Sequence, residues 1–397
     1  MTASRSTPRL RAALAAALLA IVAGGTAATV QAAGPEKQLS GVLEAIDARR
    51  LDLALQRVEA LIAAHPNFRL AHLIRGDLLL ARRQPIQTLG NVPKTVPQDR
   101  IEGLRAEAHS RLRALRERPN GDLVPRHVLQ LDADQQHALV VDSRRSRLYV
   151  FQNEAGRPRL VADYYVTLGK NGVEKTLEGD QKTPIGVYHV TANLPRQKLT
   201  DFYGSGAFPI NYPNAWDKKL GRTGHGIWLH GTPSDTYSRP PRASDGCIVL
   251  ANTDLDLVAG KVRVGATPVV IADEVEWVPA ATLEAERRGL AEALEAWRAD
   301  WESRDSARYL AHYAAKFQSG SQDLAAWSAH KRKVNAGKQW IKVGLNRVSM
   351  FHYPREKFVV VGFDQDYRSS NLSNVMRKRQ YWVREGARWK ILYEGGA

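Results

Sequence analysis

The sequence is poor in cysteine: Cys247 is the single cysteine among 397 residues. One thiol cannot form an intrachain disulfide, so no disulfide framework supports the fold. Metal binding is also disfavoured, because Cys247 and the histidines His189, His225 and His230 show no recognisable ligand spacing. We therefore expect no metal and no other cofactor.

Beyond its start, the sequence also lacks an apolar run long enough to cross a membrane. The first 33 residues carry Arg5, Arg9 and Arg11 near their start and continue with the small apolar run Ala12–Ala28. They end near Val30-Gln31-Ala32, which has the small-residue pattern of a cleavage site. We predict a signal peptide over residues 1–33, export to the periplasm or cell envelope, and no integral membrane segment after cleavage. An uncleaved anchor is the alternative.

Acidic residues are fewer than basic ones, 41 against 57, which gives a formal net charge of +16. Such a chain favours polyanionic partners: nucleic acid, anionic lipid or an acidic cell-wall polymer. No nucleic-acid-binding motif accompanies the charge, and export argues against nucleic acid as a partner. A basic surface without a specific partner is the alternative.

Residues 36–118 have the pattern of a helical region. Apolar residues recur at helical spacing in three segments, and a further helix is expected after them: Leu39–Asp47, Leu51–Ala64, Leu70–Arg82 and Gln98–Arg116. Residues 54–66 and the helix that follows resemble a tetratricopeptide unit, although about one and a half units are visible and an array needs three. Such helices serve either as a surface for a protein partner or a homodimer, or as a cap on the next domain.

Short strands replace helices from His137 onward, after the turn-rich residues 119–136, which suit a linker. Segments 138–142 and 147–151 flank a polar turn and predict a hairpin. Further short apolar segments follow as far as a strand at 266–272. The pattern predicts an all-β domain over residues 137–275.

The last region, residues 282–397, begins with three helical patterns: Leu283–Glu302, Asp305–Phe317 and Trp327–Lys333. Strand patterns follow: Trp340–Val343, Arg347–Tyr353, Lys357–Tyr367, Asn374–Arg384 and Arg388–Tyr393. Helices followed by an antiparallel meander predict an α+β domain. Its tryptophans suit a cone-like sheet that curls over the helices around a pocket: Trp297, Trp301, Trp327, Trp340, Trp382 and Trp389.

The chemistry-bearing stretch is Ser244–Leu250, which holds the lone thiol directly after a glycine. Upstream of it, the apolar run Ile227–Leu229 ends in His230 and Gly231. A thiol, a histidine and a glycine-permitted turn are the minimum parts of a cysteine acyl-transfer site, in which backbone N–H groups receive the oxyanion. A buried structural cysteine is the alternative for the thiol considered alone.

Three blocks of the middle region resemble the YkuD-type L,D-transpeptidase catalytic domain, over residues 137–272. They are Gly179–Tyr188 with its Thr183-Pro184-x-Gly186 core, Gly221–Thr232 and Ser244–Ile248, in the order and at the spacing of the family. The resemblance implies a β-rich fold that acts on peptidoglycan stem peptides, at the L-to-D bond after the third residue. With helices before it and a nuclear transport factor 2-like domain after it, the arrangement resembles the cell-shape-determining L,D-carboxypeptidases.

The resemblance also implies a role for each central residue. Cys247 would be the nucleophile that forms a thioester, His230 the general base, and the backbone oxygen of Gly231 the group that orients the histidine ring. The N–H groups of Gly246 and Cys247 would form the oxyanion hole, and Gly246 would lack a side chain so that substrate can approach closely. An amine resolves the thioester in a transpeptidase, and water resolves it in a carboxypeptidase.

Further residues near these blocks are candidates for substrate binding: Arg222, His225, Trp228, Arg242, Ser244 and Asp245. Either arginine could pair with a substrate carboxylate, the alternative being a solvated loop charge. Trp228 has an alternative as a core ring, and His225 as a neutral loop residue.

The sequence departs from the family pattern at two positions. Asp245 stands where many members carry a second histidine, and Val249 stands where many carry arginine or asparagine. Transpeptidase and carboxypeptidase therefore both stay open. A non-catalytic wall-binding scaffold, using the charge, the helices and the C-terminal pocket, is the alternative of a different class.

Overall fold

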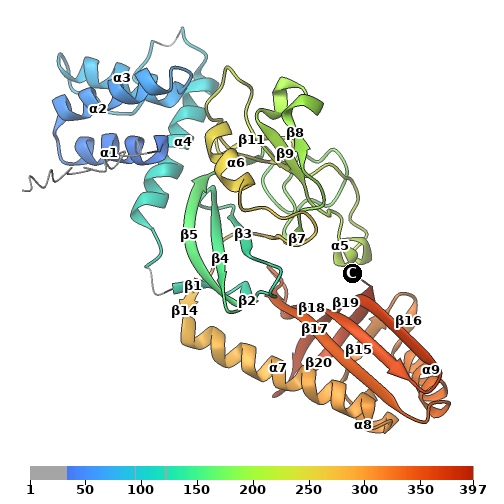
Figure 1. Cartoon of the computed structure of the whole chain (residues 1–397). Coiled ribbons are helices and arrows are strands. Elements are labelled where there is room, and N and C mark those ends of the chain that lie inside the picture. The colour runs from blue at the N-terminus through green and yellow to red at the C-terminus, as the bar shows by residue number, and fades with distance from the viewer. Residues whose placement is uncertain (1–33, 94, 121–122, 397) are drawn as a thin grey trace, which may run out of the picture.

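The computed structural model describes residues 34–93, 95–120 and 123–396. The predicted signal peptide, residues 1–33, lies outside this part of the chain. Three regions follow one another along the molecule (Figure 1): helices at the N-terminal end, a β-rich middle region, and a long twisted sheet with a long helix at the C-terminal end.

The N-terminal region consists of the helices α1 (Pro35–Asp47), α2 (Leu51–Ala64), α3 (Arg69–Ala81) and α4 (Gln98–Arg116). Their bounds follow the patterns in the sequence, because apolar residues repeated every three or four positions give each helix one face to bury. Leu39, Val58 and Ile74 lie in one buried cluster, which also includes Tyr237 and Ala251 of the middle region. The helices therefore pack directly against the middle region, and their tetratricopeptide character stays a prediction.

The middle region is built mainly from short strands: β1 (Leu123–Pro125), β2 (Val128–Gln130), β3 (His137–Asp142), β4 (Arg147–Glu154), β5 (Arg157–Tyr165), β6 (Leu168–Gly169), β7 (Gly186–His189), β8 (Leu194–Pro195), β9 (Gly206–Pro209), β10 (Trp228–His230), β11 (Arg242–Ser244), β12 (Ile248–Val249), β13 (Pro268–Ala272) and β14 (Trp277–Pro279). One sheet has the order β5-β4-β3-β13-β7, another has the order β12-β10-β9-β8, and β11 pairs with β6. The predicted hairpin is present as β3 and β4, with Asp142 opposite Arg147. Leu139, Phe208 and Ile248 lie in a single apolar core contributed by both sheets.

The all-β prediction for this region needs correction, because helices interrupt the strands. They are α5 (Ala215–Lys219), α6 (Asn252–Ala259) and two 3-10 turns, η1 (Arg196–Lys198) and η2 (Asp201–Tyr203). A capping box between Asn214 and Asp217 starts α5. Helices of one or two turns show too little periodicity to be recognised from sequence. The middle region is therefore mostly β.

The C-terminal region contains α7 (Ala280–Glu302), α8 (Ser306–Leu310), α9 (Leu324–Ala336), β15 (Tyr313–Ser319), β16 (Gln322–Asp323), β17 (Ile341–His352), β18 (Phe358–Ser369), β19 (Leu372–Glu385) and β20 (Arg388–Gly396). Its sheet has the order β16-β15-β20-β19-β18-β17-β2. Helix α7 lies against this sheet (Figure 1) and buries Leu290, Leu294, Trp297 and Trp301 at helical spacing. Of the six tryptophans named above, Trp340 is 46% exposed and the other five are buried.

Two predicted elements of the C-terminal region differ from the structure. The helix predicted over Asp305–Phe317 ends at Leu310, and Tyr313 begins a strand that pairs with β20. The two strands predicted between Trp340 and Tyr353 form the single strand β17, which has a register shift where two strands were expected to separate. In the first place, pairing with a distant strand decides the local structure. In the second, pairing with β18, the next strand along the chain, continues through the whole segment.

Buried charges join the helical region to the middle region. Glu36 on α1 pairs with Arg111 on α4 and, at 2.6 Å, with Arg147 on β4. Arg111 also pairs with Glu107 at 2.9 Å, and neither of these two side chains is more than 3% exposed. These ion pairs connect the two regions. Because an isolated buried charge is costly, removing one of the partners would destabilise the contact. At the other end, β2 pairs with β17 and so connects the middle region to the C-terminal sheet.

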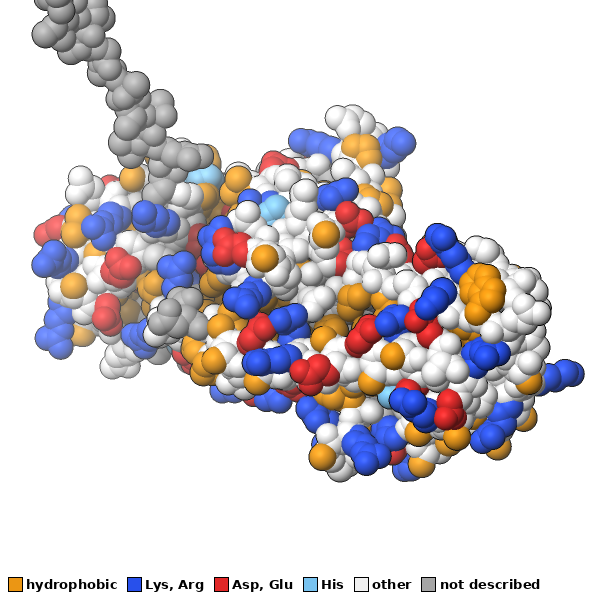
Figure 2. Space-filling model, turned by 60° about the horizontal axis from the view of Figure 1, so that its bottom comes forward, with side chains coloured by type: hydrophobic (Ala, Val, Ile, Leu, Met, Phe, Trp, Pro, Cys, Tyr) orange, Lys and Arg blue, Asp and Glu red, His pale blue; other side chains and the backbone are white. Residues whose placement is uncertain are grey.

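The surface carries both signs of charge. Figure 2 shows Lys and Arg side chains spread among acidic ones over the face drawn, rather than gathered in a single basic stripe. Over the described ranges of the chain, no helix combines the length and the apolar character that a membrane span requires.

Candidate active site

Cys247 lies in a tight turn between β11 and β12. Gly246 precedes it with φ +121°, a backbone conformation that residues with a side chain rarely adopt. A Cβ atom at this position would lie 2.7 Å from the carbonyl oxygen of Lys182. The turn itself therefore requires the glycine, which is a different reason from the substrate approach that the sequence suggested.

Two hydroxyl groups fix this turn. Ser244 Oγ accepts the Gly246 N–H at 3.2 Å and donates to the Cys247 carbonyl at 2.7 Å. Thr183 Oγ1 donates to the Gly246 carbonyl at 3.0 Å and accepts the Gly169 N–H at 2.9 Å. Ser244 and Thr183 thus position the residue that carries the thiol. The Gly246 N–H, a predicted oxyanion donor, is engaged by Ser244 in this structure.

His230 ends β10, which runs parallel to β12. The register pairs His230 with Val249, so the histidine lies beside the strand that follows Cys247. Its Nδ1 atom lies 2.7 Å from the carbonyl oxygen of Gly231. A carbonyl accepts but cannot donate, so the ring proton is on Nδ1 and Nε2 keeps its lone pair. This is the tautomer that a general base needs, with Gly231 as the orienting group.

Both reactive groups are uncharged near neutral pH. Burial, aided by the charge of Arg239 and opposed by the bond to Gly231, lowers the pKa of His230 to about 4. Burial raises the pKa of the Cys247 thiol, although a backbone hydrogen bond with Trp228 and, less strongly, the charge of Arg239 oppose this shift. The free thiol donates to the Gly226 carbonyl at 3.5 Å, and within the described residues no hydrogen bond joins it to the histidine. The resting pair is therefore a thiol and a neutral imidazole.

Asn252, the first residue of α6, connects the histidine turn to the loop after η2. Its Oδ1 accepts the N–H groups of Ser205 and Thr232 at 2.9 and 3.2 Å, and its Nδ2 donates to the Thr232 carbonyl at 2.8 Å. A Cβ atom at Gly231 would lie 2.0 Å from this Oδ1, so the glycine leaves room for the amide. Sequence reasoning missed Asn252, because nothing in its local pattern separates it from an ordinary residue at the start of a helix.

Two aromatic rings of η2 cover the histidine. The Tyr203 ring lies edge-on to His230 with centroids 5.1 Å apart, and the Phe202 ring lies tilted at 5.8 Å. The guanidinium of Arg239 lies over Phe202, 4.8 Å from the ring centroid. Sequence reasoning missed Arg239 as well, since an arginine before two prolines is too common a pattern to mark a site.

The two arginines predicted to bind substrate lie in different settings. Arg222 pairs with the fully buried Asp217 at 2.9 Å, which commits its guanidinium to the fold. Arg242 lies exposed on β11. Arg222 is therefore engaged within the fold, and the arginine whose charge influences the thiol is Arg239.

The other predicted substrate-binding residues lie around the turn of the thiol. Asp245 is exposed and pairs with Lys170 at 3.0 Å. His225 is exposed as well, with Nε2 3.8 Å from a carboxylate oxygen of Glu178. The Trp228 ring packs against the tyrosine of η2 with centroids 5.0 Å apart, so it supports the aromatic cover of the histidine.

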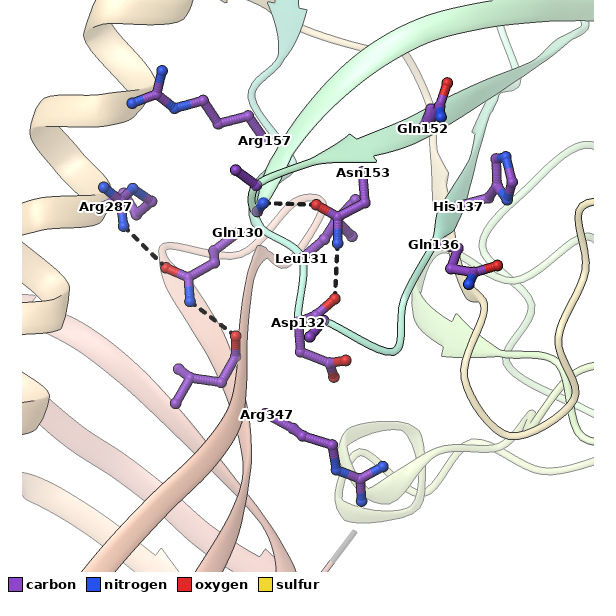
Figure 3. Close-up of a pocket in the computed structure, with 14 residues that line it drawn as sticks. Gln130, Leu131, Asp132, Gln136, His137, Gln152, Asn153, Arg157, Arg287 and Arg347 are labelled. Carbon is purple, nitrogen blue, oxygen red and sulfur yellow. Dashed lines mark hydrogen bonds between the residues drawn. The ribbon is translucent and has the colours of Figure 1, made fainter.

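A polar cavity of about 730 Å³ lies away from this site, where β2 meets β17 (Figure 3). In it Arg287 donates to Gln130, which donates in turn to a backbone carbonyl of β17. Arg347 pairs with Asp134 at 2.7 Å. These arginines already have partners, and no predicted site residue lines the cavity, so it is not where we expect the chemistry.

Comparisons with known families identify the middle and C-terminal regions of the chain. Residues 136–271 match the family model of the L,D-transpeptidase catalytic domain, YkuD, and residues 289–395 match that of the Cds6 C-terminal NTF2-like domain. The chain therefore contains a YkuD-family L,D-transpeptidase catalytic domain followed by an NTF2-like domain. No curated protein matches the chain significantly.

Solved structures share the fold over 68% to 77% of this chain. The structure of Bdellovibrio bacteriovorus Bd1075 is 29% identical with a TM-score of 0.60, over 70% of this chain and 98% of that one. The helical cell shape determining protein Pgp2 from Campylobacter jejuni is 24% identical with a TM-score of 0.57, over 68% of this chain and 95% of that one. Its K307A mutant gives 23% identity and a TM-score of 0.58, over 77% of this chain and 100% of that one. The shared fold spans nearly the full length of each of the solved structures.

Proposed function

We propose that this protein is an exported peptidoglycan L,D-transpeptidase that uses Cys247 as nucleophile and forms a thioester at the third residue of the stem peptide. The observation that carries the proposal is the bond from His230 Nδ1–H to the Gly231 carbonyl, which leaves Nε2 free to accept the thiol proton. The match of residues 136–271 to the L,D-transpeptidase catalytic domain supports the same chemistry. Export rests on the signal-like pattern of residues 1–33.

The proposed reaction starts from the uncharged pair. Cys247 Sγ attacks the carbonyl carbon of the third residue while its proton passes to His230 Nε2, which gives an oxyanion and an imidazolium. The N–H of Cys247 would bind the oxyanion; that of Gly246 would have to leave Ser244 first. Collapse of the intermediate breaks the C–N bond, returns the proton to the departing amine of the D-residue, and leaves the thioester.

The second half of the reaction decides the product. An amine of another stem peptide attacks the thioester carbonyl and gives its proton to His230, and the expelled sulfur of Cys247 takes that proton back. The result is a crosslink. Water in place of the amine gives the free tripeptide, which is the product of a carboxypeptidase.

Incubation with a disaccharide tetrapeptide, with products identified by mass, tests this proposal. Crosslinked dimers are the expected products. Tripeptide with free D-Ala and no dimer would instead assign the carboxypeptidase. Absence of both products would contradict an enzymatic role and favour the non-catalytic wall-binding scaffold.

The pH dependence should reflect the neutral pair. We expect kcat/KM for the stem peptide to be flat from about pH 5 upward and to fall only near pH 4, where His230 takes up a proton, rather than near the ordinary histidine value of about 6.5. Because burial raises the pKa of Cys247, its alkylation by iodoacetamide should accelerate only above about pH 8.5, the ordinary thiol value. An acid limb near pH 6.5, or rapid alkylation at pH 6, would contradict the neutral pair.

The setting in the cell follows from the same proposal. Pgp2 is described as a helical cell shape determining protein, and we propose that this chain acts on the wall in a comparable role. A protein partner or homodimer through the N-terminal helices remains a proposal too. The buried contact of those helices with Tyr237 and Ala251 favours the other alternative, a cap on the catalytic region.

A further inference from the structure

Among the residues that the structure describes, Arg239 is a half-buried guanidinium without an acidic partner. Within the described residues no carboxylate lies at ion-pair distance from it, and its close contact is the ring of Phe202 at 4.8 Å. Asp235 and Asp245 act on its charge only from further away. Burial, the largest influence, lowers the pKa of Arg239, as expected for a cation removed from water without full compensation.

Other buried or half-buried arginines near the site are compensated. Arg222 has Asp217, and Arg111 and Arg147 share Glu36. A desolvated cation without a counterion destabilises a fold, so a protein that keeps one normally supplies the counterion from elsewhere. The missing anion is therefore expected on the ligand.

The position of Arg239 relative to the reacting groups indicates which part of a ligand it meets. Its guanidinium lies on Phe202, and the same ring lies on His230. Its charge also contributes to lowering the pKa of both Cys247 and His230, although burial is the largest influence on each. An anion held by Arg239 would thus lie next to the bond that the thiol attacks.

The backbone of Arg239 is firmly held. Its carbonyl accepts hydrogen bonds from Tyr165 Oη at 2.9 Å and from Thr167 Oγ1 at 3.0 Å. Thr167 in turn exchanges two backbone hydrogen bonds of 2.9 Å with Val249, on the strand that follows the thiol. Arg239 and Cys247 are therefore fixed to the same strand, which is the preorganisation that a binding group requires.

The N-terminal helices complete this support. The ring of Tyr237 packs on Phe68 with centroids 4.3 Å apart. Ser238 Oγ donates to Glu107 Oε1 at 2.7 Å, and Asn67 Nδ2 donates to the Ser234 carbonyl at 3.1 Å. The loop that carries Arg239 is thus held on one side by the catalytic strands and on the other by the helices.

We propose that Arg239 binds a carboxylate of the stem peptide, on one of the two residues that the cleaved bond joins. This inference rests on the proposed function and adds a specificity-determining residue to it. Two carboxylates satisfy the chemistry: the α-carboxylate of the terminal D-residue, one residue from the scissile carbonyl, and the side-chain carboxylate of a diamino acid at the third position. A guanidinium presents two parallel N–H groups to either of them.

Arg239→Gln is the variant that tests the proposal, with Arg239→Lys as the conservative variant and Arg159→Gln as the control. Arg159 is an exposed arginine on β5 that pairs with Glu154 and lies in neither the catalytic nor the binding machinery. Each protein is assayed for kcat/KM with three tetrapeptides: unmodified, amidated at the C-terminus, and amidated at the third-residue side chain.

We expect Arg239→Gln to lower kcat/KM for the unmodified peptide by about 10- to 100-fold, the effect of losing a charge-assisted hydrogen bond. The wild type should disfavour one amidated peptide to a similar degree, and Arg239→Gln should turn over that peptide as well as the wild type does. The carboxylate that Arg239 binds is the one whose amidation makes kcat/KM independent of Arg239. Arg239→Lys should retain part of the preference, and Arg159→Gln all of it.

Comparison between peptides protects the test from a folding defect, which would lower all rates equally. An equal loss on all three peptides, or an unchanged preference in Arg239→Gln, would overturn the inference while leaving the proposed function intact. A wild-type protein that turns over none of the peptides would overturn the proposed function and this inference with it.

Discussion

Replacing Cys247 with alanine should abolish turnover of the stem peptide. It should also abolish covalent labelling by a carbapenem, because the same thiol would attack the β-lactam carbonyl of that compound. The loss should be roughly 10⁴-fold or more, because the remaining groups cannot form a thioester without the sulfur. Intact-mass spectrometry provides the measurement: the wild type should gain the mass of one carbapenem, mapped to the peptide that contains Cys247, and the variant should gain none.

Stability separates this effect from damage to the fold. The thiol is partly exposed, and its hydrogen bond to the Gly226 carbonyl is long at 3.5 Å. Cys247→Ala should therefore unfold within a few degrees of the wild type, since small changes at such positions cost about 0.5 kcal/mol or less. Retained turnover in a variant that melts normally would show that the nucleophile is another group.

Replacing Gly246 with alanine should lower kcat/KM and the rate of carbapenem acylation by about 100-fold or more, the effect of misplacing a reacting atom by about 1 Å. Alanine at φ +121° is strained, and its Cβ would meet the Lys182 carbonyl oxygen at 2.7 Å. The backbone must shift to relieve both problems, and the next residue carries the thiol. Thermal unfolding should fall too, because a strained residue of this kind costs about 1–3 kcal/mol.

Gly260→Ala is the matched control for this substitution. Gly260 has φ −64°, and the nearest atom to an added Cβ is 3.8 Å away. Alanine there should leave the rate unchanged and stabilise the protein by about 0.4–1 kcal/mol through the unfolded state. A Gly246→Ala variant that behaves like Gly260→Ala would mean that the turn tolerates a side chain and that its glycine serves the substrate instead.

The parts of the site that lie close together in sequence could be predicted from it. Cys247 and Gly246 are neighbours, and His230 and Gly231 follow a short apolar strand, so local pattern together with the family resemblance was enough to propose roles for them. Arg239 could not be found in this way. Its significance comes from the absence of an acid partner and from the ring of Phe202, and both are properties of the folded chain.

The fold shows the same limit. The helices over residues 36–116 and the hairpin of β3 and β4 follow local periodicity, and they are present as predicted. The segment Asp305–Phe317 also has helical spacing of its aromatic residues, yet Tyr313 pairs with Ile391 and continues as a strand. A distant strand outweighs local preference there, and a single sequence does not reveal which distant strand will be adjacent.

The contact between the N-terminal helices and the loop that carries Arg239 restricts how domains of such chains can be exchanged. Across this contact the ring of Tyr237 packs on Phe68, and Ser238 donates a hydrogen bond to Glu107. The N-terminal helical region therefore supports the loop that carries Arg239. Residues 119–136 are not a simple linker, because they contain β1 and β2. A crossover between α4 and β1 that joined the helices of another protein to this catalytic region would leave apolar and charged side chains without their partners. The N-terminal helices and the catalytic region would therefore have to be exchanged together, although the turn-rich sequence between them suggests a domain boundary.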